Sequence, residues 1–297
     1  METTTQNTTT QVENIFANIS NNYFHLTASE KKVADYVLSN KTQVQFMSIS
    51  ELADASRVGE ATLSRFCKRL KLTGYNAFKL ALAKATVQEQ GGLPTLEGQT
   101  GQINENDSIA ELCQKVYSAQ TTAIAQSMEL VQPDKITTAV DWLFSARRVW
   151  CLGQGGSMIL ADETAHIFST ISDKFTSVTD SHRQASAVAL MQPEDVLIFF
   201  SYSGSTKEFM ELTKIADSRK VRIILITRFS RSPGATQADI VLQCGSYEGP
   251  FQLGSMPARM AQLFIVDVLY NEYIRRDPIG CHHNQELIAN ALADKHI

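Results

Sequence analysis

The chain has 297 residues, of which 43% are hydrophobic and 20% are charged, and its net charge at pH 7 is −4. This composition is typical of a globular protein and excludes a polycationic chain, and the length allows two domains. No apolar run reaches the ~18 residues that a membrane helix needs, and residues 1–12 are polar, without the apolar core of a signal peptide. We therefore expect a cytoplasmic protein with a disordered tail over residues 1–12 and no membrane partner.

The first helices are predicted from their caps and their apolar spacing. Residues 27–30 read Thr-Ala-Ser-Glu, which matches a capping box and opens a helix through Val33 and Val37. A second helix is expected near residues 49–53, with Ser50 as its N-cap.

A short turn at residues 55–59 precedes a third helix, which we expect over residues 60–70. This helix is amphipathic, because its apolar residues recur at i, i+3, i+4 and i+7. One face carries Leu63, Phe66, Cys67 and Leu70, and the opposite face carries Thr62, Ser64, Arg65, Lys68 and Arg69. Another helix follows, with Phe78, Leu80, Leu82 and Ala85.

Two helices around a short turn match the helix-turn-helix plan, in which the second helix enters the major groove of DNA. No Asp or Glu occurs between Ala61 and Gln88, so this segment is a local basic block. Arg pairs with guanine, Thr and Ala contact thymine methyl groups, and Lys and Arg suit phosphates. A plain helical bundle with a solvated basic face is the alternative. We expect Glu60, Ala61, Thr62, Ser64 and Arg65 to face outward and meet base edges, and Lys68, Arg69 and Lys71 to meet phosphates.

Residues 89–107 are rich in Gly and polar residues and lack apolar periodicity, which indicates a linker. It separates a helical domain at residues 13–88 from a longer domain at residues 108–297.

The longer domain alternates apolar runs with helical stretches, after two helices that begin near Ile109 and Pro133. This alternation predicts an α/β fold with a doubly wound parallel sheet, whose ligands bind beyond the carboxyl ends of the strands. Strands are expected at residues 149–152, 196–200, 223–226 and 240–242, with a weaker one at 175–179, and helices at 159–171, 184–190, 207–218 and 256–273.

A loop of hydroxyl side chains follows the apolar strand at residues 196–200 and precedes a helix. A helix N-terminus has unpaired N–H groups and the positive end of the dipole, so it suits a phosphate. The loop lacks the pattern of a nucleotide P-loop, which favours a phosphorylated small molecule over ATP. A Ser-rich turn that only caps the helix is the alternative. The hydroxyl residues are Ser201, Ser203, Ser205 and Thr206.

A second loop, at residues 153–157, also connects a strand to a helix. It approaches the dinucleotide pattern G-x-G-x-x-G, but Met158 occupies the last Gly position, so we do not expect a dinucleotide cofactor. Glycines such as Gly155 allow the backbone to approach a ligand closely, and Ser157 can donate a hydrogen bond to it. The cysteines show no C-x-x-C spacing, so we expect no metal site either.

Together these segments resemble the RpiR-type bacterial transcriptional regulators, which carry a helix-turn-helix and a sugar isomerase (SIS) domain. In the helical domain the resemblance rests on residues 27–30, 33–34, 48–53, 61–70 (ATLSRFCKRL) and 74–79. In the longer domain it rests on residues 153–157 (GQGGS), 195–196, 201–208 (SYSGSTKE), 232–233, 238–239 and 255–263. The resemblance covers nearly the whole chain after the tail.

The resemblance implies a homodimeric or homotetrameric regulator of carbohydrate metabolism genes that senses a phosphosugar and binds a double-stranded operator with an inverted repeat. It implies that Ser201, Ser203 and Thr206 hold the phosphate, with Ser205 nearby and Ser157 contributing. One departure is Gly59, where the family often has Ser before the recognition helix.

Two other functions stay open at this point. A phosphosugar isomerase needs a base, for which Glu248 and the histidines are candidates, and Arg259 can meet an anion. A related synthase subgroup has a Lys near the position of Pro257, and Pro cannot act as that Lys does. We therefore expect a regulator, not an enzyme, with Glu248 as an effector contact. The third alternative is a sugar-phosphate binding module whose N-terminal helices only mediate oligomerisation.

Overall fold

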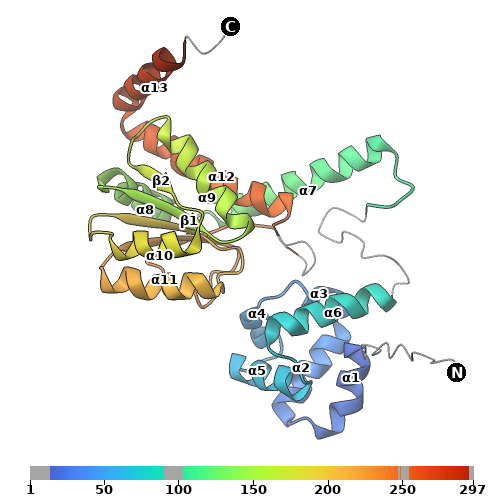
Figure 1. Ribbon diagram of the computed structural model, residues 1–297. Coiled ribbons are helices and arrows are strands. Elements are labelled where there is room, and N and C mark those ends of the chain that lie inside the picture. Colours follow the sequence, from blue (N-terminus) through green and yellow to red (C-terminus); the bar gives the residue numbers. More distant parts are fainter. Residues whose placement is uncertain (1–13, 90–102, 247, 249–253, 294–297) are drawn as a thin grey trace, which may run out of the picture. The chain divides into compact units, whose positions relative to one another are not determined.

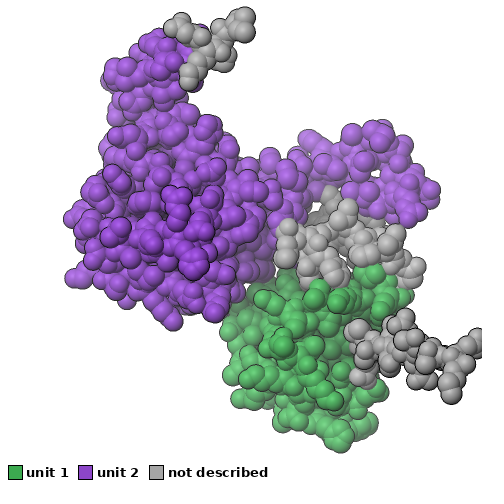
Figure 2. Space-filling view, viewed as in Figure 1, with its two compact units in different colours: residues 1–95, 249–251 green, residues 96–248, 252–297 purple. Residues whose placement is uncertain are grey.

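The computed structural model describes residues 14–89, 103–246, 248 and 254–293. The chain divides into two compact units, of which the first contains the described residues 14–89 and the second the described residues 103–246, 248 and 254–293 (Figure 2). The expected tail at residues 1–12 and most of the expected linker, residues 90–102, lie outside the described residues. The domain boundaries drawn from the sequence therefore stay a prediction.

The first unit consists of helices around one apolar core, to which Leu63, Phe66 and Phe78 contribute fully buried side chains. Its elements are α1 (Ile15–Asn22), the 3₁₀ turn η1 (Tyr23–His25), α2 (Ala28–Ser39), α3 (Lys41–Val44), α4 (Ile49–Ala55), α5 (Glu60–Arg69) and α6 (Tyr75–Glu89) (Figure 1). The short helices α1 and α3 were not predicted from the sequence.

Two capping boxes fix the starts of α2 and α4. The one at Thr27 and Glu30 confirms the prediction for α2. For α4 the prediction of Ser50 as the N-cap was wrong, because that residue already lies within the helix. Ser48 is the cap: its Oγ accepts the N–H of Glu51 at 3.1 Å, and the Glu51 carboxylate accepts the N–H of Ser48 at 2.8 Å. The reciprocal pair satisfies two N–H groups that the helix leaves unpaired.

The second unit is a parallel sheet of five strands in the order β2-β1-β3-β4-β5, with helices on both faces (Figure 1). This arrangement confirms the predicted doubly wound α/β fold. Its strands are β1 (Val149–Gly153), β2 (Phe175–Ser177), β3 (Val196–Phe200), β4 (Arg222–Thr227) and β5 (Ile240–Gln243). Its helices are α7 (Ile109–Leu130), α8 (Pro133–Ser145), α9 (Gly156–Ser169), α10 (Ser181–Ala189), α11 (Lys207–Ser218), α12 (Met256–Arg276) and α13 (Pro278–Leu292). Helix α13 was not predicted.

The central strand β3 is buried along its whole length, and its side chains alternate between two cores. Ile198 and Phe200 pack in the core formed with α8, α9 and α12, while Leu197 and Phe199 pack in the core formed with α10 and α11. Burial on both faces explains why β3 reads as a continuous apolar run in the sequence. Among the described helices, none combines the length and the apolarity needed to span a bilayer.

Candidate nucleic-acid interface and effector loops

Helices α4 and α5 form a helix-turn-helix, joined by a turn in which Arg57 adopts a positive φ of 56°. The turn closes with a hydrogen bond of 2.9 Å from the N–H of Val58 to the carbonyl of Ala53. Gly59 is the N-cap of α5 and offers no side-chain acceptor. Core contacts, rather than a cap, therefore hold the start of the second helix, whose side chains Leu63 and Phe66 are fully buried.

The outward surface of α5 carries most of the residues that the sequence assigned to it. One assignment was wrong: Thr62 is buried, and its Oγ1 accepts a hydrogen bond of 3.3 Å from Nη2 of Arg65. Thr62 lies four residues before Phe66, so it borders the apolar stripe that docks on the core. It is not part of the outward surface, but its hydroxyl contacts Arg65 there. The exposed residues are Glu60, Ala61, Ser64, Arg65, Lys68 and Arg69.

The two loops singled out in the second unit lie side by side at one edge of the sheet. Strands β1 and β3 are neighbours, and Gly153 at the end of β1 pairs with Phe200 at the end of β3. The loops at residues 153–157 and 201–206 leave these two strand ends. This is the edge at which parallel sheets bind ligands.

The hydroxyl loop is ordered by hydrogen bonds between its own residues. The Oγ of Ser201, which is buried, lies 2.9 Å from Oγ1 of Thr206 and accepts the N–H of Gly204 at 3.1 Å. The Oγ of Ser203 accepts the N–H of Ser205 at 3.2 Å, and both serines are exposed. Ser203 and Ser205 thus present hydroxyl groups to solvent on a loop whose base is fixed.

The first turn of α11 has no side-chain cap. Thr206 is its N-cap residue, yet the Thr206 hydroxyl makes no capping bond, because it faces Ser201. Within the described part of the chain, the N–H groups of this turn therefore have no side-chain cap, at the positive end of a helix of twelve residues. An anion fits such a position.

Gly204 brings the hydroxyl loop into close contact with the segment at residues 232–234. Its φ is +60°, and a Cβ atom placed on it would lie 1.9 Å from Oγ of Ser232 and 2.6 Å from its Cβ. The carbonyl of Gly204 accepts the N–H of Gly234 at 2.8 Å. Only glycine meets both requirements at position 204, namely a left-handed backbone and no side chain.

Tyr202 ties the hydroxyl loop to the segment after β5. Its hydroxyl donates to the carbonyl of Ser246 at 3.1 Å and accepts the N–H of Glu248 at 2.7 Å. Glu248 is buried, and its Oε1 accepts the N–H of Ser255, the N-cap residue of α12, at 2.7 Å. The structure therefore connects Glu248 to the loop through Tyr202 and engages its carboxylate at the start of α12.

Burial raises the pKa of Glu248 above its ordinary value, although hydrogen bonds from Ser255 and the charge of Arg259 act in the opposite direction. The folded protein therefore holds the Glu248 proton more tightly than the unfolded chain does. The stability that this proton contributes is fully present below the pKa of Glu248 in the unfolded chain, and it is lost as the pH rises through the pKa of Glu248 in the folded protein. We expect Glu248→Gln to raise Tm relative to the parent protein more at about pH 7.5 than at about pH 4. Thermal unfolding at the two pH values measures this difference.

The same change at Glu163, an exposed carboxyl on α9, is the matched control for the loss of one carboxylate. An equal shift for Glu248→Gln at both pH values would contradict the expectation.

A buried glutamine holds the first loop. The side-chain N–H₂ of Gln184, on α10, donates to the carbonyl of Gly153 at 3.0 Å and to that of Val178 at 2.7 Å. Its Oε1 accepts from the side chain of Gln154 at 2.6 Å. No pattern in the sequence predicts this role of Gln184. Within the loop, Gly155 has a φ of 55° and lies exposed, and Ser157 is half-buried.

Arg259, in the first turn of α12, lies over the first loop. A Cβ atom placed on Gly156 would be 3.4 Å from Nη2 of Arg259, and one placed on Gly254 would be 3.3 Å from it. The Nε of Arg259 is buried and has no hydrogen-bond partner among the described residues. A buried guanidinium N–H without an acceptor is costly, and an anion would supply one. Sequence reasoning named Arg259 only as a residue that can meet an anion, because nothing along the chain places α12 beside this loop.

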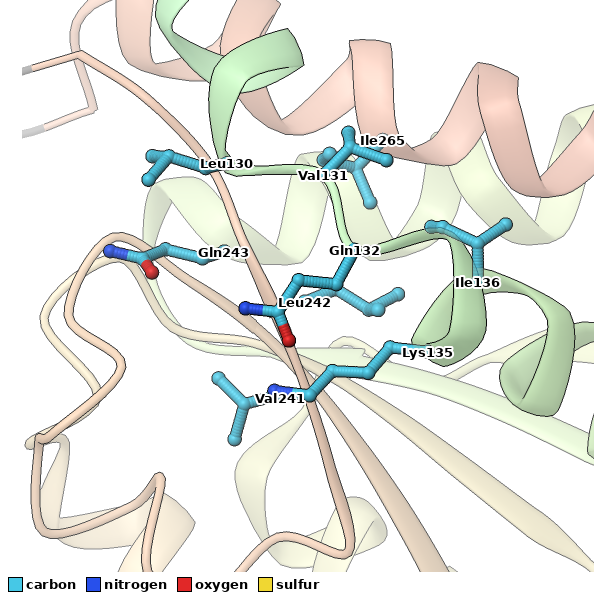
Figure 3. Close-up of a pocket in the computed structure, with 9 residues that line it drawn as sticks. All are labelled: Leu130, Val131, Gln132, Lys135, Ile136, Val241, Leu242, Gln243 and Ile265. Atoms are coloured by element: carbon cyan, nitrogen blue, oxygen red, sulfur yellow. The ribbon is translucent and has the colours of Figure 1, made fainter.

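A separate cavity, where the connection between α7 and α8 meets β5, does not suit a sugar phosphate (Figure 3). Its volume is about 10 Å³, room for one water molecule. Its wall includes Val131, Ile136 and Leu242. None of the residues in its wall belongs to the two loops.

An exposed basic helix within a helix-turn-helix, in one chain with a doubly wound sheet, defines a helix-turn-helix regulator that carries an α/β domain. Comparison with known proteins agrees. Residues 13–89 match the model of the helix-turn-helix domain of the rpiR family, and residues 142–272 match that of the SIS domain.

Related proteins are similar along most of the chain. An HTH-type transcriptional regulator of Caldanaerobacter subterraneus subsp. tengcongensis is 32% identical over 82% of this chain and 84% of its own length. The regulator HexR of Escherichia coli is 26% identical over 95% of both chains. The structure of the Vibrio vulnificus NanR protein, complexed with ManNAc-6P, has a TM-score of 0.83 at 24% identity and covers 95% of this chain and 99% of NanR. The chain belongs to the rpiR family of HTH-type transcriptional regulators, which confirms the resemblance seen in the sequence.

Proposed function

We propose that the SIS domain binds a phosphorylated sugar at the two loops and that this binding changes the affinity of the helix-turn-helix for its operator. The observation that carries the proposal is the first turn of α11, whose N–H groups have no side-chain cap and follow a loop of hydroxyl groups. In this proposal Ser201, Ser203, Ser205 and Thr206 surround the phosphate. Gly155 and Ser157 approach the sugar from the neighbouring loop.

Arg259 is the cation of this proposed site, since its buried Nε lacks an acceptor among the described residues. Glu248 holds the site in place through its hydrogen bonds to Tyr202 and to the start of α12. NanR, which shares the fold along almost its entire length, was solved with the phosphosugar ManNAc-6P, and this supports a ligand of the same class. An effector acts only through a difference in affinity for two states of the regulator.

Catalysis is not part of the proposal. The curated relatives compared above are named transcriptional regulators. The Glu248 carboxylate, the candidate base, already accepts a backbone N–H, and Pro257 stands near the position where the synthases carry Lys. Turnover of fructose 6-phosphate by the purified protein would overturn this part of the proposal.

For the operator, we propose that base edges are read by Arg65, with Glu60, Ala61 and Ser64 beside it, and that Lys68 contacts a phosphate. A homodimer or homotetramer would place two such helices on an inverted repeat. The test is capture of fragmented genomic DNA by the purified protein at fixed salt, with and without a panel of phosphosugars. Enrichment of a few inverted repeats, altered by one sugar, is the expected result. No enrichment under any condition would refute the proposal.

The proposed phosphate contacts predict a separation of the two functions. Ser203→Ala and Thr206→Val each remove one hydroxyl, and we expect each to weaken binding of the active phosphosugar about tenfold or more, because a hydrogen bond to a charged group is lost. Binding of operator DNA without the sugar should not change. Calorimetry measures the first quantity and a fluorescence anisotropy titration measures the second.

Ser218→Ala is the control, since it removes an exposed hydroxyl from the far end of the same helix. Normal sugar binding by the Ser203 and Thr206 variants would place the phosphate elsewhere.

A further inference from the structure

The side chain of Arg69 joins the last turn of α5 to the start of α2. Its Nε donates to Oε1 of Glu30 at 3.1 Å, and its Nη1 reaches the carbonyl of His25 at 3.4 Å. These two acceptors lie on either side of Thr27, the N-cap of α2. The guanidinium therefore spans the corner where the chain enters α2.

Glu30 is an unusual partner for a surface arginine, because it is 2% exposed. Its Oε2 accepts from both the N–H and the Oγ1 of Thr27, at 2.8 and 2.9 Å, and this leaves Oε1 for Arg69. Burial by itself would raise the pKa of Glu30, but the hydrogen bonds from Thr27 and Arg69 outweigh it and lower the pKa. The carboxylate is thus ionised and fully engaged, with Arg69 as its partner in an ion pair.

The two ends of α5 are held in different ways. The first turn has no side-chain cap, because its N-cap is Gly59. At the other end, the C-terminus of a helix favours a cation. Arg69 lies there, and its guanidinium group contacts the start of α2. Lys68, the preceding residue, is exposed, and its side chain makes no hydrogen bond or ion pair within the described part of the chain.

We propose that Arg69 is a positioning residue, which fixes the direction of the recognition helix by tying its last turn to Glu30 and His25, and that it does not neutralise a DNA phosphate. The inference rests on the proposed DNA-binding function. It replaces the phosphate contact that the sequence suggested for Arg69, and it leaves that contact to Lys68.

The salt dependence of DNA binding separates the two roles, because each phosphate contact contributes about 0.9 to the slope of log K against log salt. The probe is an operator fragment enriched in the genomic capture, and affinity is measured with the full-length protein at several salt concentrations. We expect Arg69→Gln to lower affinity at least about fivefold with an unchanged slope, whereas Lys68→Gln should lower the slope by about 0.9.

Glu30→Gln and the double variant with Arg69→Gln complete a double-mutant cycle. We expect Glu30→Gln to lower the affinity for DNA in the same way. The double variant should lose no more affinity than the single variant that binds DNA less tightly. Circular dichroism at the assay temperature establishes that each variant is folded. Arg69→Lys provides a second test if Glu30→Gln does not fold: it keeps the charge but loses the planar fork, so we expect weaker binding at an unchanged slope.

Three results would overturn the proposal: a slope that falls by about 0.9 in Arg69→Gln, additive losses in the cycle, or parental affinity in Arg69→Gln. Failure of the parental protein to bind any genomic fragment would instead refute the proposed function itself, so the two failures are distinguishable.

Discussion

Replacement of Gly204 with alanine is expected to abolish the response to the effector while the protein still binds its operator. At a φ of +60° a Cβ atom costs about 1–2 kcal/mol. The added methyl group would also overlap Ser232, for which overpacking costs about 1–3 kcal/mol more. Movement of the loop would relieve both, and it would displace the Ser203 hydroxyl relative to the first turn of α11.

Calorimetric titration of the active phosphosugar measures the loss, and operator binding by anisotropy serves as the internal control. The double variant with Ser232→Gly removes the overlap but keeps the backbone strain, so it should recover part of the sugar affinity. Sugar binding at the parental level in Gly204→Ala would show that the geometry of the hydroxyl loop does not determine effector affinity.

For the operator, we expect Arg65→Ala to reduce specific affinity by roughly ten- to a hundredfold, or about 1–3 kcal/mol, and non-specific affinity much less. The reason is the position of Arg65: it is exposed on α5, and its guanidinium is oriented by the hydroxyl of the buried Thr62 at 3.3 Å. A pre-oriented planar donor is suited to guanine.

The comparison variant is Lys68→Ala, one turn further along the same helix. It removes one positive charge, as Arg65→Ala does, but we expect it to weaken specific and non-specific binding to a similar extent. Anisotropy titrations against the enriched operator and a scrambled sequence, at the same salt concentration, measure both ratios. Equal losses of specific and non-specific affinity in Arg65→Ala would count against its role in reading bases.

Local signals in the sequence predicted the elements that depend on neighbouring residues. The capping box at Thr27 and Glu30 and the strand Val196–Phe200 were predicted as found. Helix Lys207–Ser218 was predicted with its observed bounds. Errors arose where two local solutions compete, as for Ser48 and Ser50 at the start of α4. Short helices such as α3, with four residues, carry too little periodicity to be recognised.

The sequence by itself determined the two-part organisation, the helix-turn-helix and the hydroxyl loop, because capping, periodicity and strand-to-helix turns are properties of contiguous residues. Only the tertiary structure decided which side chains are exposed on α5 and which lie beside the two loops. Thr62 is buried by the packing of α5, Arg69 meets a partner 39 residues away, and Arg259 lies over Gly156 although α12 is distant along the chain. Such contacts depend on how elements pack together, and the spacing of residues along one element does not encode this packing.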